Sequence, residues 1–180
     1  MMARKPDERD HIDRFLETIH HVFPELDLEV EGIVDRIGGL NRRLNRTLDE
    51  TLAEFGLDTA EYKALSVLSQ AGPPHRSTPG RLSERMELSS GAMTNRLDRL
   101  EEAGLVRRLR DPDDRRSVLV ELTDHGRETY RSAVGVQAQK VALVAAALNP
   151  REKSQMNALL RKLMLEFERR ERSGGRAPPP

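Results

Sequence analysis

The sequence contains no cysteine and no tryptophan, and aromatic residues make up only 3% of its 180 residues. The absence of cysteine excludes disulfide bonds, thiolate metal sites and redox sensing through a thiol. The scarcity of aromatic side chains argues against a single-strand nucleic-acid binder that stacks bases. The sequence also lacks a charged-then-apolar leader and any apolar run of about 18 residues. We therefore expect a cytoplasmic protein without a signal peptide or membrane span.

The chain has no net charge, because 30 basic residues balance 30 acidic ones. A neutral chain exerts no global attraction on nucleic acid, so any nucleic-acid site must arise from a local arrangement of charge. Hydrophobic residues make up 37% of the sequence, which is enough for a buried core. The length allows one domain or two small ones.

Apolar residues recur every three or four positions in both terminal parts of the chain, which predicts helices. A helix from Asp7 to Pro24 carries Ile12, Phe15, Ile19 and Phe23 on one stripe. A second stripe spans residues 33–55, a third spans 124–148, and "NPRE" at 149–152 begins the last helix. These stripes exceed what a small domain can cover, so we predict dimerisation helices at 7–56 and 123–172. The predicted tails are residues 1–6 and 173–180.

The middle of the chain, residues 57–122, has a different pattern. Asp58 and Glu61 form a capping pair at the start of one helix, Thr78-Pro79 begins a short helix, and Ser89 caps a third that ends at Gly104. After Gly104 the pattern changes to extended chain, with strands at 105–109 and 117–122 around a proline-containing turn. The prediction is a mostly α protein whose central domain is a winged helix-turn-helix.

The helix after Ser89 is the predicted recognition helix, because the second helix of such a pair enters the DNA major groove with its N-terminal part. Asparagine can pair with adenine, arginine with guanine or a phosphate, and the threonine methyl group with thymine. The candidate residues are Ser89, Ser90, Thr94, Asn95, Arg96 and Arg99. For Arg96 a DNA contact and an ion pair with acids of its own helix remain alternatives.

The turn between the two strands reads "DPDDRR" at residues 111–116. An arginine at a projecting tip can enter a narrow minor groove, where the negative potential is concentrated. Arg116 and Arg115 are the candidates, and Asp114 can hold the guanidinium of Arg116 at a fixed angle. The alternative is a solvated turn, but the helix–turn–helix–hairpin order favours a DNA-binding wing.

Residues 82–126, "LSERMELSSGAMTNRLDRLEEAGLVRRLRDPDDRRSVLVELTDHG", resemble the MarR family of bacterial transcription regulators. The wing motif of that family, Asp-x-Arg followed by an apolar strand ending in Leu-Thr, matches Asp114, Arg116, Leu122 and Thr123. The resemblance implies a homodimer on a palindromic operator, usually a repressor, released by a small organic and often aromatic or anionic effector.

The helix before Pro24 resembles the N-terminal extension of a family branch that includes urate-responsive members. Those members carry a tryptophan near the dimer helices and an acid where this chain has Lys63, so we do not expect urate as the effector. The candidate effector residues are Arg42, Tyr62 and Lys63, from an anion pocket between the dimer helices and the winged domain. The absence of cysteine also excludes the peroxide-sensing branch.

The sequence indicates neither an enzyme nor a cofactor. It has no visible nucleophile–base pair, phosphate-binding loop or metal cluster, and its five histidines lack the i, i+4 spacing that zinc sites often use. The alternative to a DNA-binding regulator is a protein-interaction module that uses the winged fold as a docking surface. Weak salt dependence of binding would favour that alternative.

Overall fold

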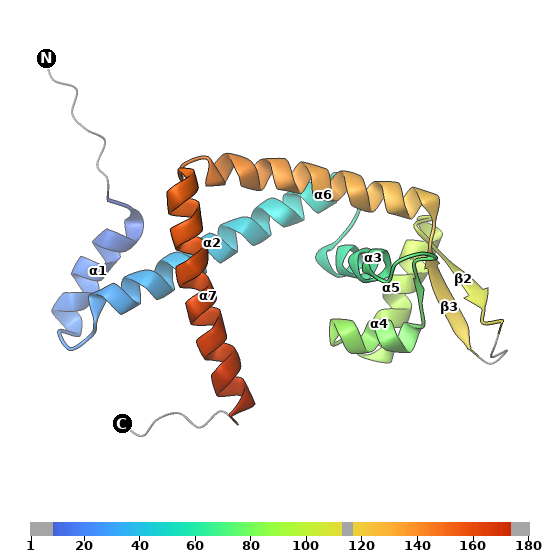
Figure 1. The fold of residues 1–180 in the computed structure, drawn as a ribbon, viewed down its shortest axis with the longest axis horizontal. Helices are drawn as coiled ribbons and strands as arrows, with labels where there is room; N and C mark the ends of the chain where they lie inside the picture. The colour runs from blue at the N-terminus through green and yellow to red at the C-terminus, as the bar shows by residue number, and fades with distance from the viewer. Residues whose placement is uncertain (1–8, 113–116, 174–180) are drawn as a thin grey trace, which may run out of the picture. The chain divides into compact units, whose positions relative to one another are not determined.

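The computed structural model describes residues 9–112 and 117–173, and the chain is mostly helical with one small sheet (Figure 1). In chain order the elements are α1 (His11–Val22), α2 (Leu28–Ala53), α3 (Thr59–Gln70), β1 (Arg76–Ser77), α4 (Pro79–Met86), α5 (Ser90–Glu102), β2 (Val106–Arg110), β3 (Val118–Leu122), α6 (Asp124–Ala145) and α7 (Pro150–Arg172). This order confirms the predicted winged helix-turn-helix between N- and C-terminal helices. The predicted tails lie outside the described residues, apart from Ser173, which caps α7.

The chain divides into two compact units, residues 1–137 and 138–180. The first unit contains α1 to α5, the sheet and the first part of α6. The second contains the rest of α6 and all of α7. Among the described helices, none combines the length and the apolar character needed to cross a membrane.

The helices of the winged region begin at the caps that the sequence predicted. The Asp58 carboxylate accepts the backbone N–H of Glu61 at 2.8 Å, and the Glu61 carboxylate accepts the N–H of Asp58 at the same distance. Ser89 caps α5 by accepting the N–H of Ala92 at 3.3 Å. Gly104 follows α5 with a φ of 70°, a conformation that favours glycine and ends the helix. These caps satisfy groups that helix ends leave without a partner.

The sheet has three antiparallel strands in the order β1-β3-β2. β2 and β3 form the predicted hairpin, in which Val106 lies opposite Leu122. The sequence did not predict β1, whose Arg76 lies opposite Glu121 on β3. A strand of two residues is too short for an alternating pattern, and only its pairing with β3 defines it.

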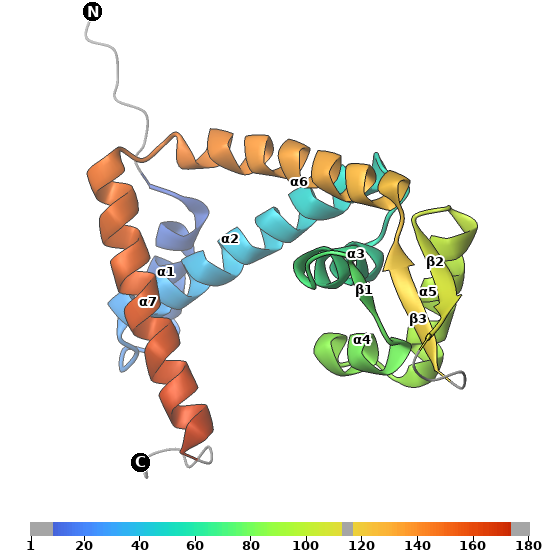
Figure 2. The same ribbon diagram turned by 45° about the vertical axis from the view of Figure 1, so that its right-hand side comes forward.

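The core of the first unit lies between α3, α4, α5 and the sheet (Figure 2). In these elements, the apolar side chains with at most 2% exposure are Ala64, Leu65, Leu68, Leu82, Met93, Leu97, Leu100, Val106 and Val120. Leu52 of α2 and Ala133 of α6 belong to the same buried cluster. Each large one contributes about 1.5–3 kcal/mol relative to an exposed position. Leu97 and Leu100 of α5 face this core, whereas Ala103, the C-cap of the helix, is exposed.

The N-terminal helix α1 packs against α2 of the same chain. Ile12 and Leu16, one turn apart, are buried. They lie over two glycines of α2: a Cβ added at Gly32 would lie 3.2 Å from Cδ1 of Leu16, and one at Gly39 would lie 3.9 Å from Cδ1 of Ile12. Small residues at these positions let the two helices approach closely. Phe15, on the predicted stripe with Ile12, is 49% exposed in this chain.

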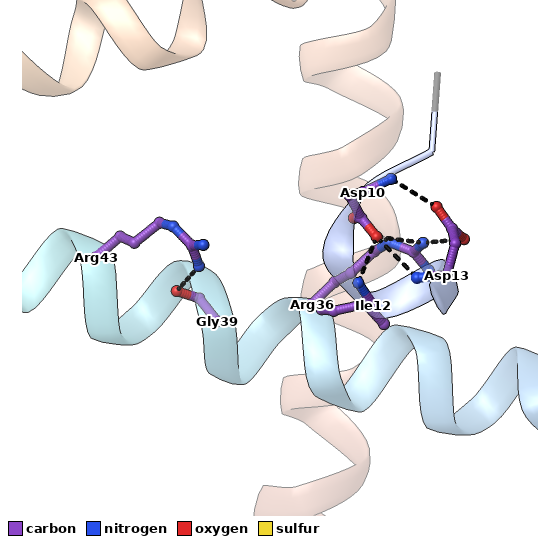
Figure 3. Close-up of polar contacts among 6 residues, drawn as sticks. All are labelled: Asp10, Ile12, Asp13, Arg36, Gly39 and Arg43. Atoms are coloured by element: carbon purple, nitrogen blue, oxygen red, sulfur yellow. Dashed lines mark hydrogen bonds and ion pairs between the residues drawn. The ribbon is translucent and has the colours of Figure 1, made fainter. Parts of the chain in front are cut away.

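Arg36 of α2 holds the first turn of α1 through two carboxylates (Figure 3). Its Nε donates to Asp10 at 3.0 Å, and its guanidinium also donates to Asp13 at 2.5 Å. Asp10 is the N-cap of α1, so the helix begins at His11 instead of the predicted Asp7. The backbone N–H of Asp13 and the Arg36 guanidinium lower the pKa of Asp10 to about 2.

Two sets of large apolar side chains remain exposed. On the first two thirds of α2, exposures of 39–57% are found at Val30, Ile33, Val34, Ile37, Leu40 and Leu44. In the second unit, exposures of 37–78% are found at Leu143, Val144, Met156, Leu159, Leu160, Leu163, Met164, Leu165 and Phe167. None of the residues of α7 is buried. Contiguous apolar surface of this kind marks an interaction site in soluble proteins.

Candidate nucleic-acid interface

Helix α5 has one buried face and one exposed face. Met93, Leu97 and Leu100 point into the core, and this packing fixes the rotation of the helix about its axis. Ser90, Thr94 and Asn95 are all exposed on the first turns. The candidate residues at the start of α5, Ser89, Ser90, Thr94 and Asn95, are therefore all accessible in the structure.

Two serines and a threonine shape the N-terminal end of α5. The Ser89 hydroxyl accepts the N–H of Ala92, which leaves its own hydrogen available for donation. The Thr94 hydroxyl donates to the carbonyl of Ser90 at 2.9 Å, so its hydrogen is used within the helix and its methyl group remains for apolar contact. Helix N-termini favour anions, because free N–H groups and the positive end of the helix dipole meet there.

Arg96 and Arg99 extend toward the N-terminus of α3. Arg96 forms an ion pair with Asp58. The Nε of Arg99 lies 2.9 Å from a carboxylate oxygen of Glu61, and its NH1 lies 3.7 Å from Asp58. The acids are those of the α3 capping box, not the acids of the same helix that we considered from the sequence. Arg99 is 60% exposed and Arg96 is 31% exposed, so Arg99 is the more accessible of the two.

Arg108 of β2 connects the hairpin to α5. Its NH2 lies 2.6 Å from Asp98, and its NH1 lies 2.5 Å from Glu101. The backbone N–H of Arg108 also donates to the Glu101 carboxylate at 2.9 Å. Burial lowers the pKa of the guanidinium, but the hydrogen bonds to both acids outweigh that effect and raise its pKa. The sequence did not predict this contact, since seven or more residues separate the partners.

A second charged cluster, formed by Arg76, Glu121 and Arg107, joins all three strands of the sheet. Glu121 of β3 lies between Arg107 of β2 and Arg76 of β1, which are its direct neighbours on either side. Arg107 donates from Nε to Glu121 at 2.9 Å, and Arg76 lies 2.8 Å away. Glu121 is only 6% exposed. The hydrogen bond from Arg107, followed by the charge of Arg76, lowers the pKa of Glu121.

Three of the predicted site residues, Asp114, Arg115 and Arg116, lie outside the described residues, and so does Asp113. The strands on either side are described and paired over their full length, from Val106–Leu122 to Arg110–Val118.

The three candidate effector residues have different surroundings. Lys63 lines a surface pocket of about 430 Å³ together with Asp49, Asp58, Thr59, Ala60, Met86, Leu88 and Arg96. Tyr62 packs at a tilt against Tyr130 of α6, with ring centroids 5.3 Å apart, and burial raises the pKa of Tyr62. The guanidinium of Arg42 lies along α2 beside Gly38. Within residues 9–112 and 117–173, acids and histidines form no cluster suited to a metal ion.

Comparison with known proteins supports this arrangement. A sequence model of the MarR family matches residues 57–118, which span the winged region. The structure of wild-type MarR from Escherichia coli superposes with a TM-score of 0.60 and 30% identity, over 72% of this chain and 94% of that one. The chain belongs to the MarR family. Members of this family are transcription regulators and not enzymes, and this chain is a DNA-binding regulator of that type.

Two further MarR-family relatives extend the similarity. The regulator PecS of Dickeya dadantii is 29% identical over 137 residues, which cover 76% of this chain and 82% of PecS. A mutant of Escherichia coli MarR complexed with operator DNA superposes with a TM-score of 0.57 and 28% identity, over 80% of this chain and 96% of that one. The PecS match reaches well beyond the winged region into the flanking helices.

Proposed function

We propose that the chain works as a homodimer that binds palindromic operator DNA, with one α5 helix in the major groove of each half-site. The observation that carries this proposal is the exposed face formed by Ser90, Thr94 and Asn95 at the start of α5. The Asn95 amide can pair with adenine through two hydrogen bonds, and the Thr94 methyl group can contact thymine. Ser89 and Ser90 can hold a phosphate at the helix N-terminus.

The two arginines of α5 have different proposed roles. Arg99 is the more exposed, and a phosphate can compete for its guanidinium with Glu61 and Asp58. Arg96 is more enclosed and paired with Asp58, which favours the structural alternative over a base contact. The acids of the α3 capping box therefore contribute to the electrostatics of the recognition helix from a neighbouring element.

The wing supplies the minor-groove contact in this proposal. Arg116 enters the groove, Asp114 orients its guanidinium, and Arg115 adds positive charge near the DNA backbone. The support comes from the sequence motif and from the β2–β3 hairpin, whose strands end on either side of these residues. A related chain, a mutant of Escherichia coli MarR, has been crystallised in complex with operator DNA, which supports a DNA-binding role for the shared fold.

The proposed homodimer is supported by the exposed apolar side chains of α2 and of residues 138–180. A second copy of the chain can cover these faces, and two-fold symmetry then gives two equivalent recognition helices. Their separation is expected to be about 34 Å, one turn of DNA, which matches a palindromic operator.

The proposal also includes regulation. The DNA-bound dimer represses transcription, and a small organic molecule releases the dimer from the operator. An effector that binds more tightly to a dimer with wrongly spaced recognition helices weakens DNA binding, and DNA weakens effector binding by the same factor. Lys63 lines an open pocket and is the strongest of the three candidate effector residues. Tyr62 and Arg42 do not line that pocket.

The test is binding to the DNA immediately upstream of the gene for this chain, measured by fluorescence anisotropy at two salt concentrations. Wild type is expected to bind tightly, with an affinity that falls steeply with salt. Arg116→Ala is expected to bind at least about tenfold more weakly, or ~1.4 kcal/mol. The control Arg131→Ala removes the same charge from an exposed position on α6 and is expected to leave the affinity within about twofold.

Equal binding of wild type and Arg116→Ala would contradict the role of the wing. Binding to operator and random duplexes with one affinity would contradict the sequence-specific function, and it would favour the protein-docking alternative.

A further inference from the structure

The contact between Arg108 and α5 joins the two parts of the winged region that contact DNA in the proposed binding mode. Arg108 lies on β2, which leads into the wing, and both of its acidic partners lie on the recognition helix. The guanidinium binds Asp98 at 2.6 Å and Glu101 at 2.5 Å, and the backbone N–H adds a third bond to Glu101 at 2.9 Å. Three bonds from one residue fix both the side chain and the strand against the helix.

The geometry of both elements favours this contact. Asp98 and Glu101 are three residues apart and therefore lie next to each other on the same side of α5. A guanidinium presents several N–H groups in a rigid plane, so it can bind both carboxylates at once, which a lysine ammonium cannot do with the same geometry. The neighbouring Arg107 points to the other face of the strand, where it binds Glu121.

The two acids are unexpected on a helix that faces DNA. Asp98 is 55% exposed and Glu101 is 38% exposed, so both carry negative charge near the proposed site of a polyanion. Simple electrostatics predicts that removing them strengthens DNA binding, because fewer negative charges repel the phosphates. Their presence is explained if they hold Arg108, and through it the hairpin, at a defined angle to α5.

We propose that Arg108 is a positioning residue that sets the angle between the recognition helix and the wing by binding Asp98 and Glu101 together. This angle determines the distance along the DNA between the major-groove contacts of α5 and the minor-groove contact of the wing. Arg108 thereby contributes to the choice of operator without touching a base. The inference rests on the proposed function, because it assigns a role within the same DNA-binding mode.

The test compares affinities for two probes: a duplex that wild-type protein selects from a random-sequence library, and a random duplex of equal length. The double variant Asp98→Asn/Glu101→Gln is expected to bind the selected duplex at least about tenfold more weakly than wild type. The same variant is expected to bind the random duplex equally well or more tightly. Its specificity ratio therefore falls although its net charge has become more favourable for DNA binding.

Two variants of Arg108 separate positioning from a direct phosphate contact. Arg108→Lys keeps the charge but cannot bridge both acids in the same way, so positioning predicts a loss of specificity similar to that of the double acid variant. A phosphate contact predicts that Arg108→Lys binds nearly as wild type and that Arg108→Gln lowers the salt slope by about 1. Arg107→Gln is the matched control on the adjacent residue, and its specificity ratio is expected to stay within about twofold.

Combining Arg108→Lys with the two acid substitutions tests whether these residues act as one unit. The losses are expected to be far less than additive, because the first substitution already removes the contact. Thermal unfolding of each variant checks that the winged region remains folded.

Unchanged or tighter binding of the double acid variant to the selected duplex would overturn the positioning role while leaving the DNA-binding function intact. If the wild-type protein selected no duplex at all, the proposed function itself would fail and this inference with it.

Discussion

The winged region, residues 57–122, and the helices α2 and α7 differ in where their large apolar side chains lie. In the winged region, Leu65, Leu97 and Val120 are at most 1% exposed. On the first two thirds of α2 and on α7, apolar residues at the same helical spacing are mostly 40% exposed or more, and α7 buries none of its residues. The periodicity is similar in both regions, but only the winged region completes its core within one chain.

The difference indicates what each region requires in order to be stable. Helical stability in proteins comes mostly from packing of an apolar face, not from helix propensity. The winged region has that packing from α3, α4, α5 and the sheet. The exposed apolar faces of α2 and α7 also require packing, which the proposed second chain supplies. On this account the winged region reads DNA, and the remaining helices place two copies of it on one operator.

The largest expected effect follows from placing a charge on the exposed stripe of α7. Leu163→Glu is expected to prevent dimer formation, because a carboxylate would be buried without a partner. Operator affinity should fall at least about a thousandfold, or ~4 kcal/mol, since one chain keeps a single recognition helix. Light scattering and anisotropy measure both results. Lys162→Glu, at the adjacent exposed position, is the control and should remain a dimer.

A second substitution tests the winged core directly. Leu97→Ala is expected to lower the free energy of unfolding by about 2–5 kcal/mol, because Leu97 is 1% exposed and a cavity would remain. Chemical denaturation measures this loss. Asn95→Ala, on the exposed face of the same helix, is expected to change stability by less than about 0.5 kcal/mol while weakening operator binding. Similar effects of the two variants on stability would contradict the division of α5 into two faces.

The Arg76–Glu121–Arg107 cluster gives a smaller, pH-dependent effect. Glu121→Gln is expected to lower the stability at pH 7 by about 1–3 kcal/mol, because charged hydrogen bonds are lost. The folded-state pKa of Glu121 is lowered, so its contribution is present above its unfolded pKa and is lost as the pH falls through the folded pKa. The difference between wild type and variant should therefore shrink as the pH falls below about 4.3. A constant difference down to pH 3 would contradict the ion-pair assignment.

The smallest expected effect concerns the attachment of α1 to α2. Arg36→Gln removes the ion pairs with Asp10 and Asp13 but leaves Ile12 and Leu16 on the glycines of α2. Amide exchange in α1 is expected to become faster, while operator affinity stays within about twofold. Because the pKa of Asp10 is about 2 and the pairing is lost only as the pH falls through it, exchange in wild-type α1 should not depend on this group between pH 4 and 8. Protection unchanged in the variant would show that the apolar contacts alone hold α1.

The sequence predicted the winged region well because its signals are local. Caps at Asp58, Ser89 and Asn149 lie within three residues of the groups they bind, and the change from helical spacing to alternation marks the hairpin. The missed features depend on contacts between distant residues. β1 exists only through its pairing with β3, and Arg108 finds its partners only after the hairpin folds against α5.

The sequence also did not predict which face of α1 packs against α2, because Phe15 and Leu16 lie on two different helical stripes. The glycines of α2 decide between them, because they leave room for Ile12 and Leu16. Likewise, the acids that pair with Arg96 and Arg99 were sought on α5 itself, whereas the tertiary fold brings the α3 capping box to them.

The proposed two-chain assembly is tested most directly by native mass spectrometry of the protein mixed with the duplex that it selects. We expect two chains in the free protein and two chains on each duplex, with no accumulation of a one-chain complex. A single chain in the free protein, together with a single chain on each duplex, would contradict the assignment of the exposed α2 and α7 faces to a second copy.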